Sequence, residues 1–243
     1  MAASPRRPDI GEIKRKVTSH TLAVNKLRFD ESVTAGAVHP LLLLTPQRMD
    51  IAAKHIYARH RQLGAQSKWA ANLYCQHIRA FSNGTFREDD GSKNSAEDYL
   101  MGFDRLLDSI RSGGFDDNKT LVPVGRDNVI IDGSHRVASC IAANVPVGVV
   151  HFDHASNEYG ARYFEGKGMA SGWLDAMALE YCRLKTGALI VTVYPSAEGR
   201  HGEIQAILRQ HGEIAYEKNV ALNRQAARNL ITEIYAGEPW LGD

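Results

Sequence analysis

The sequence has few cysteines, no long apolar run and almost no excess charge, and each shortage excludes a class of protein. Its three cysteines, Cys75, Cys140 and Cys182, are far apart and odd in number, so neither a disulfide framework nor a zinc site is indicated. No apolar run reaches the length of a membrane span, and residues 1–16 lack the apolar stretch of a signal peptide. We therefore expect a cytoplasmic protein with reduced thiols and no membrane partner.

The charge balance limits the kinds of binding partner that we expect. Lys and Arg number 29 against 28 Asp and Glu, which gives a formal net charge of +1. Such a balance produces no global attraction to nucleic acid, so any recognition by charge has to be local. We do not expect nucleic acid as a partner, although the basic amino-terminal segment leaves a nucleic-acid-associated module open as an alternative.

The chain divides into three expected regions. Residues 1–37 are polar and weakly periodic, which is typical of an arm or a short helix packed late, with flexibility expected for the first ten residues. Residues 38–155 carry the helices and strands of a core. Residues 156–243 alternate strand and helix patterns as a carboxy-terminal α/β extension.

The expected secondary structure follows from periodicity and turn residues. Apolar positions at helical spacing predict two helices within residues 48–81, separated at Gly64, and Ser95 begins a helix that should end at Gly113-Gly114. Residues 40–46 are bracketed by prolines and should lie extended, and residues 83–93 read as an exposed loop that could act as a lid. The other expected elements are strands at 122–124, 129–131, 145–152, 188–194 and 213–222, and helices at 136–143, 174–181, 202–210 and 224–236. The alternation predicts an α/β (mixed α+β) fold with a mixed sheet.

The segment with the most chemical content is the motif of residues 132–136, Asp-Gly-Ser-His-Arg, which is set between an expected strand and an expected helix. A helix that begins here presents unpaired backbone N–H groups and the positive end of its dipole, both of which favour a phosphate. Gly133 permits close backbone approach or a positive φ, and Ser134 offers a hydroxyl. His135 and Arg136 add donors suited to phosphate oxygens. The purely structural interpretation is that Asp132-Gly133 forms a turn, Ser134 is an N-cap and Arg136 is solvated.

Residues 130–138, preceded by Pro123-Val124, resemble the signature of the ParB/sulfiredoxin-like fold superfamily. The resemblance covers about residues 99–150 and implies a nucleotide-binding core of that fold. Sulfiredoxins carry a cysteine directly before the His-Arg pair, whereas this chain has Ser134, which cannot perform thiol chemistry. Partition proteins of the ParB type continue into a helix-turn-helix, which the alternating pattern after residue 150 does not suggest.

The free-serine kinases of this superfamily are the nearest in motif, since they share an Asp-Gly-X-His-Arg turn. Their resemblance implies a phosphotransferase with an alcohol group as acceptor, in which an acidic residue near the start of the preceding helix is the base. Glu97 and Asp98 stand in that place here, although acids in a first helical turn also serve as caps. The implied cofactors are ATP or ADP with Mg²⁺, and Asp132 could ligate the metal or only fix the turn.

Six further polar residues are candidates for substrate contact: Arg48, Lys54, Lys68, His151, Arg200 and His201. The first three fall on the expected early helices, His151 ends an expected strand, and the last two belong to a polar loop before a helix. Each also has a purely structural explanation. The first three could lie on a solvated helix face, His151 could be a structural histidine, and the last two could belong to an ordinary surface loop. The leading hypothesis is thus a kinase of an amino acid, sugar or related metabolite, with a non-catalytic nucleotide-binding switch as the alternative and a homodimer possible.

Overall fold

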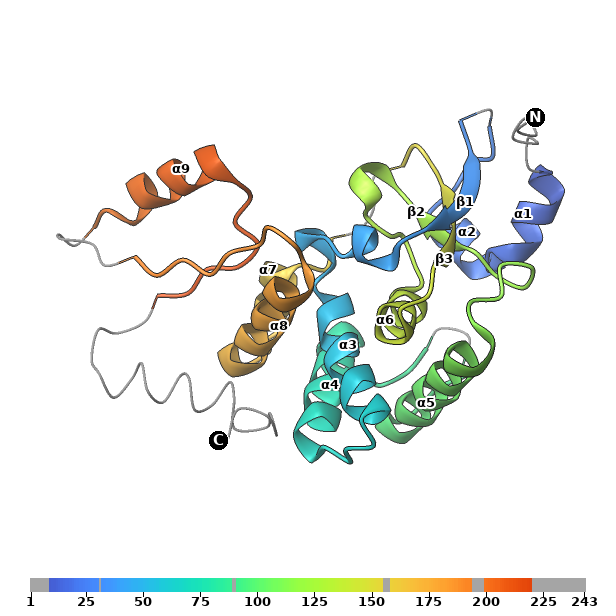
Figure 1. Cartoon of the computed structure of the whole chain (residues 1–243), viewed down its shortest axis with the longest axis horizontal. Coiled ribbons are helices and arrows are strands. Elements are labelled where there is room, and N and C mark those ends of the chain that lie inside the picture. Colours follow the sequence, from blue (N-terminus) through green and yellow to red (C-terminus); the bar gives the residue numbers. More distant parts are fainter. Residues whose placement is uncertain (1–8, 31, 89–90, 155–157, 194–198, 220–243) are drawn as a thin grey trace.

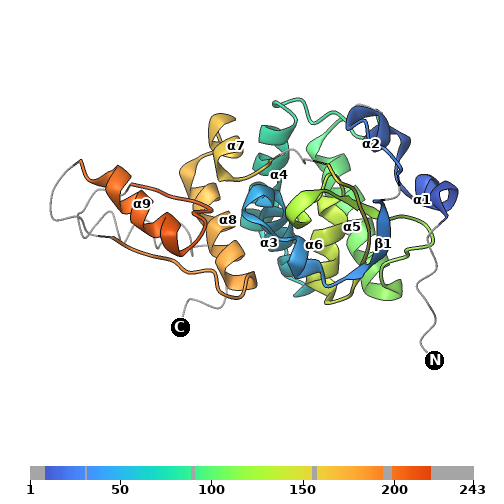
Figure 2. The ribbon, with the colours of Figure 1, turned by 90° about the horizontal axis from the view of Figure 1, so that it is seen from above.

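The computed structural model describes residues 9–30, 32–88, 91–154, 158–193 and 199–219. Within these ranges the chain has a mixed α+β fold, in which nine α-helices accompany one small three-stranded sheet. Helices α1 (Ile10–Lys16) and α2 (Ser19–Val24) lie at one end of the molecule and α9 (His201–His211) lies at the other in both views (Figures 1 and 2). The predicted mixed architecture is confirmed at this level.

The sheet is built on one buried central strand. Strand β3 (Val147–His151) lies between β1 (Thr34–Val38), which is antiparallel to it, and β2 (Val122–Val124), which is parallel to it. The parallel pair needs a crossover, and α6 (Ser134–Ala143) supplies it. The motif therefore lies in the connection between β2 and α6.

The helices that pack behind the sheet lie where the apolar periodicity predicted them. Helices α3 (Asp50–Gln62), α4 (Lys68–Phe81) and α5 (Ala96–Gly113) lie where they were predicted, and α3 and α5 both pack on α6. Ser95 caps α5 by accepting a hydrogen bond from the Asp98 N–H at 3.1 Å. Gly64, at φ 72°, separates α3 from α4. Two of the three predicted helices, α3 and α5, thus pack against the helix that begins with the motif, and α4 packs on both of them.

The amino-terminal segment packs on the sheet. Ile13 and Val17, on and just after α1, are buried in a cluster with Leu121 and Val150. The backbone N–H of Leu121 also donates to the Lys16 carbonyl at 2.9 Å. The boundary expected between residues 37 and 38 falls inside β1, and residues 1–8 of the expected arm lie outside the described residues. Residues 9–38 thus help to position the motif.

Two short segments differ from the sequence predictions. Residues 40–46 were expected to lie extended, but they enter two 3-10 turns, Pro40–Leu43 and Pro46–Arg48. A proline at the first helical position loses no hydrogen bond and has a suitable φ, which favours such turns. The strand expected at residues 129–131 is also wrong, because only one bridge forms, between Val124 and Ile130.

The described part of the carboxy-terminal region contains helices but no strand. Helix α7 (Ala161–Gly166) precedes α8 (Ser171–Leu184) and α9, and the predicted helices at 174–181 and 202–210 are confirmed. The strands predicted at 188–194 and 213–222 do not form over the described residues 188–193 and 213–219. A strand needs a paired neighbour, and here Leu189 is 81% exposed. The helix expected over 224–236 lies outside the described residues.

Two observations bear on the expectations drawn from composition. All three cysteines are free thiols, with Cys140 buried and Cys75 and Cys182 half-buried. Among the described helices, none combines the length and the apolar character that crossing a membrane requires.

Candidate functional site

The start of α6 is shaped by a glycine in a conformation that other residues rarely adopt. Gly133, the N-cap, has φ 94° and ψ 23°, in the left-handed region. A Cβ at this position would lie 2.6 Å from Nη2 of Arg136, whose guanidinium folds back over the glycine. Glycine at the N-cap has no side chain to bond the amides of the first turn, so these amides remain suited to an anion.

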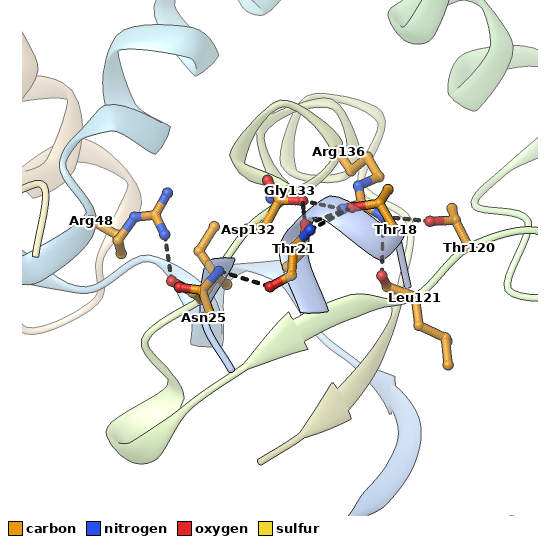
Figure 3. Close-up of polar contacts among 10 residues, drawn as sticks. Thr18, Thr21, Asn25, Arg48, Thr120, Leu121, Asp132, Gly133 and Arg136 are labelled. Atoms are coloured by element: carbon orange, nitrogen blue, oxygen red, sulfur yellow. Dashed lines mark hydrogen bonds and ion pairs between the residues drawn. The ribbon is translucent and has the colours of Figure 1, made fainter. Parts of the chain in front are cut away.

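Asp132 places a carboxylate at this helix end. One oxygen accepts from the Gly133 N–H at 2.6 Å, and the other accepts from the Thr21 hydroxyl at 2.9 Å and lies 3.4 Å from Arg136 Nη2 (Figure 3). The Asp132 side chain is nonetheless 47% exposed. The position therefore stabilises one negative charge and remains accessible to solvent.

Arg136 is turned inward. Its Nη1 donates to the Leu121 carbonyl at 3.0 Å and to the Thr120 hydroxyl, both just before β2. Its side chain is only 16% exposed, and burial lowers the pKa of the guanidinium. Because an arginine remains protonated in proteins, this side chain holds a positive charge against the amino terminus of its own helix.

The middle of the motif is buried at Ser134 and half-buried at His135. Ser134 is 9% exposed, and Nε2 of His135 lies 2.8 Å from the hydroxyl of Tyr74 on α4. The His135 ring also meets Phe103 of α5 edge-on, with 4.9 Å between ring centroids. Burial, and then the charge of Lys54, keep the pKa of His135 well below its ordinary value. His135 is thus a neutral group that joins α6 to α4 and α5.

A buried charge network lies beside the motif. Arg48 binds both oxygens of Asp50, at 2.8 and 2.9 Å, and also donates to the Ile130 carbonyl, two residues before Asp132. The Lys54 ammonium lies 3.1 Å from Asp50 and 3.4 Å from Nε2 of His77 on α4. All four residues are 3% exposed or less.

Burial sets the protonation of this network. It would raise the pKa of Asp50, but Arg48 and Lys54 outweigh it and hold that pKa well below the ordinary value. Burial lowers the pKa of Lys54 to about 8, against the opposing effect of Asp50, and lowers that of His77 well below its ordinary value. The carboxylate of Asp132 acts to raise the pKa of Lys54, and the charge of Lys54 acts to lower that of His135. Strongly perturbed groups gathered in this way are typical of functional sites.

The two acidic candidates for a base differ in their contacts. Asp98 accepts from the Asn94 N–H at 3.0 Å, and this hydrogen bond together with Ser95 lowers the pKa of its carboxyl. Asp98 is therefore engaged in the cap of α5. Glu97 is exposed in the first turn of α5, where its charge acts on the thiol of Cys75. Two residues further on, the Tyr99 carbonyl accepts from Tyr74, the partner of His135, at 3.4 Å.

The remaining candidates are dispersed. Arg48 and Lys54 join the buried network, but Lys68 is exposed at the first residue of α4, about 13 Å along the helix axis from His77. His151 ends β3 and is half-buried, which lowers its pKa. Arg200 pairs with Glu203 at 3.4 Å and His201 lies 3.9 Å from Glu217, both at α9. The structure thus gathers Arg48 and Lys54 beside the motif and leaves the other four elsewhere.

Five residues of the site were not singled out in the sequence: Thr21, Asp50, Tyr74, His77 and Thr120. The spacing of Asp50 and Lys54, four apart on a predicted helix, is a signal that could have identified one pair. Thr21, Tyr74 and Thr120 contact the motif, and His77 contacts Lys54, all from other parts of the chain. Nothing matches this chain among protein-family models, curated proteins or solved structures.

Proposed function

We propose that this chain is a small-molecule kinase that binds the phosphates of ATP or ADP at the amino terminus of α6. The observation that carries the proposal is the environment of Asp132. An amide, a hydroxyl and a guanidinium converge on its carboxylate, and this carboxylate acts in turn to raise the pKa of the buried Lys54 ammonium on α3. A phosphate oxygen needs the same set of donors.

The charge balance of the surroundings favours an added anion. Arg48, Lys54 and Arg136 contribute three cationic side chains, against the carboxylates of Asp50 and Asp132. The helix dipole adds a partial positive charge at the same point. A nucleotide phosphate would share Arg136 and the first-turn amides, and the half-exposed Asp132 carboxylate could turn outward.

The motif also fits a divalent ion held mainly by its substrate. Within the described ranges, no three His, Cys, Asp or Glu side chains are grouped closely enough to hold a metal. Mg²⁺ in phosphoryl-transfer sites is commonly held by one or two carboxylates together with substrate phosphates. Asp132, next to the phosphate position and half-exposed, is the residue that fits this role.

Glu97 is the better candidate for the base that takes the proton of the acceptor hydroxyl. Its carboxylate is exposed at the start of α5, whereas that of Asp98 is engaged by the Asn94 amide. The acceptor class follows from the resemblance to free-serine kinases: a hydroxyl of an amino acid, a sugar or a related metabolite. Arg136 would stabilise the charge that develops on the transferred group, and the charge of Lys54 would add to this from inside its buried network without contacting that group.

A thermal-shift screen of ATP and ADP with and without Mg²⁺ tests the binding step, because a ligand of the native state raises the midpoint of unfolding. Transfer is then assayed with labelled nucleotide against serine, related amino acids and sugars. We expect Glu97→Gln to keep the nucleotide shift and to lose transfer by about 100-fold or more, as for removal of a general base. Glu203→Gln, an exposed glutamate in the first turn of α9, is the matched control. Equal turnover of Glu97→Gln and the wild type would exclude Glu97.

A second candidate, a non-catalytic nucleotide switch, is favoured by the link between Asp132 and α2. Thr18 and Thr21 share a hydrogen bond of 2.6 Å, and Thr21 donates to Asp132 (Figure 3). A phosphate that displaced the Asp132 carboxylate would release Thr21 and loosen α2. In that case nucleotide would bind without transfer to any acceptor, and protease cleavage within residues 18–30 would become faster.

A further inference from the structure

Strand β1 lies at the edge of the sheet, and among the described strands only β3 pairs with it. The even-numbered residues of β3 bond to β2, and directly after β3 the Phe152 N–H continues this pattern by donating to the Val124 carbonyl at 2.8 Å. Because successive residues of a strand bond to opposite sides, the odd-numbered residues of β3 bond to β1, at positions 34, 36 and 38. The N–H and C=O groups of Ala35 and Ala37 therefore point away from the sheet.

This edge lacks, over the described residues 34–38, the features that commonly keep an edge strand from pairing. Its sequence, Thr-Ala-Gly-Ala-Val, contains no charged residue and no proline, and its first four residues are exposed. It pairs with β3 residue for residue, without a bulge. Proteins usually protect an edge with charge, proline or a bulge, because unpaired backbone groups attract another strand. An extended segment can therefore add to the sheet along β1.

A hollow of about 210 Å³ adjoins β1 on the side of α1. Ala35 pairs with Val150, which is buried against Ile13 of α1, so the side chains of Ala35 and Ala37 lie on the sheet face that α1 covers. Helix α1 and β1 lie at the same end of the molecule in both views (Figures 1 and 2). Residues 35–37 form one wall of this acidic hollow, and its charged lining consists of Asp9, Glu12, Lys16 and Asp117.

The acidic hollow has an excess of negative charge. Lys16 pairs with Glu12 at 2.6 Å, so these two charges balance. Asp9 caps α1 through one oxygen and Asp117 is exposed, which leaves two carboxylates against no further ammonium in the described lining. The positive end of the short helix α1 amounts to about half a charge at most, and the other two basic residues of α1 do not line the hollow. The surface beside the edge therefore attracts a cationic group.

We infer that the outer edge of β1 is a docking site for an extended peptide segment of a partner protein, with lysine or arginine at every second position. Alternate side chains of an added strand lie on one face, so the basic ones reach the acidic hollow. The small side chains of Ala35 and Ala37 leave room for them. A volume of about 210 Å³ lies below the usual range for ligand pockets, ~300–1,000 Å³, so it suits a side chain and not a whole metabolite.

Charge favours such a partner over a second copy of this chain. Two copies that paired β1 with β1 in antiparallel fashion would present the same sheet face on the same side, which brings their acidic hollows next to each other. Like charges placed opposite one another destabilise a strand pair. The inference does not depend on the proposed kinase function, because it rests on the backbone of β1 and on carboxylates outside residues 132–136.

The test is a titration of the ¹⁵N-labelled full chain with an eight-residue peptide in which lysine and valine alternate. We expect the amides of Ala35 and Ala37 to shift, to saturate and to become protected from hydrogen exchange. The Gly36 amide already faces β3, so its exchange should change little. Alternating protection of this kind identifies an added strand, since attraction by charge alone would not select every second amide.

Two variants and one control separate the contributions of backbone and charge. Ala35→Pro removes an outward N–H and no bond to β3, so the fold should tolerate it, and binding should weaken by about tenfold or more. Asp117→Asn should weaken binding by about two- to fivefold, as for loss of an exposed ion pair. Asp108→Asn is the matched control, because Asp108 is exposed on α5 and does not line the hollow.

Three results would overturn the inference. The first is that the lysine-valine peptide produces no saturable shift at Ala35 and Ala37. The second is that a glutamate-valine peptide, or a lysine-valine peptide N-methylated at alternate amides, binds as tightly. The N-methylated peptide gives this answer with the unaltered chain, even if Ala35→Pro does not fold. The third is that the same amides shift with protein concentration alone, which would assign the edge to a second copy.

Discussion

Helix α3 takes part in two clusters in which one carboxylate faces several basic side chains, and the clusters differ in their access to water. Near the start of α3, Asp50 binds Arg48 and Lys54, and all three are 3% exposed or less. Further along, Glu180 of α8 binds His55, Arg59 and Arg183, and the side chain of Arg183 is 47% exposed. The first cluster is sealed beside the motif, whereas the second is open to solvent at Arg183.

This difference separates two uses of charge. A sealed network has no water to replace a lost partner, so its members are fixed and can hold a neighbouring segment in one position. Arg48 does this through its hydrogen bond to the Ile130 carbonyl. A cluster open on one side is in contact with water, which can solvate a member that loses its partner. Substitutions in the two clusters should therefore have different consequences.

The largest expected effect is that of Asp50→Asn. Removing this carboxylate leaves Arg48 and Lys54 buried without a counter-charge, so we expect the free energy of unfolding to fall by about 3–5 kcal/mol. Chemical denaturation measures it. Asp153→Asn, in the exposed pair with Arg126 at 2.6 Å, is the control and should cause no measurable loss. Equal losses for the two variants would mean that the Asp50 network is not sealed.

Glu180→Gln should lower the free energy of unfolding by less, about 2–3 kcal/mol. Water beside Arg183 can solvate the basic side chains that lose the Glu180 carboxylate. Its pH dependence has a definite sign. The pKa of Glu180 is about 2 in the native state, below its ordinary 4.5, so its contribution is fully present above pH 4.5 and is lost as the pH falls towards 2. Stability curves of the wild type and variant should therefore converge on acidification. Parallel curves would contradict this assignment.

Gly133→Ala should lower the free energy of unfolding by about 1–2 kcal/mol, because alanine is strained in the left-handed conformation. The new Cβ should also displace the Arg136 guanidinium. Gly168→Ala is the matched control, since Gly168 has φ 75° and, apart from its chain neighbours, no described residue has a heavy atom within 4 Å of the place that its Cβ would take. We expect both variants to lose stability, and only Gly133→Ala to lose the thermal shift produced by nucleotide. Loss of that shift in Gly168→Ala would show that strain alone abolishes binding.

The smallest expected effect is a shift in the titration midpoint of Lys54, which NMR can observe. Burial lowers the pKa of Lys54 to about 8 from 10.5, so between these values the unfolded chain holds a proton that the native state has released. Stability attributable to Lys54 therefore rises with pH across this window. NMR titration of the Lys54 side chain, assigned with Lys54→Met, should give a midpoint near 8. A midpoint near 10.5 would place Lys54 in water.

The sequence predicted the elements that depend on local chemistry. The four-residue spacing of Trp69, Leu73 and His77 predicted α4, and Ser95 marked the start of α5. The motif was recognisable because Asp132-Gly133 is a turn signal directly before a helix pattern, and Gly133 does adopt φ 94° as the N-cap of α6. Each of these signals lies within a few neighbouring residues, where backbone preference and capping decide the structure.

The sequence predictions that were wrong concern residues whose structure depends on distant parts of the chain. Residues 188–193 are rich in β-branched side chains, but no described segment pairs with them as a strand, and Leu189 and Ile190 are exposed. Arg48 and Lys54 resembled charges on a solvated helix face. Their burial follows from Asp50 and from the packing of α4, which brings His77 to Lys54. A local pattern cannot show which surface charges the tertiary fold will enclose.

The most direct test of the proposed phosphate site is a titration of ¹⁵N-labelled chain with ADP and with ATP·Mg²⁺, observing the amides of Ser134, His135 and Arg136. We expect these amides to shift most and to saturate together, because phosphate oxygens accept from the first turn of α6. Saturation of other amides while these three stay unchanged, or no binding of either nucleotide, would contradict the assignment of this helix end as the phosphate site.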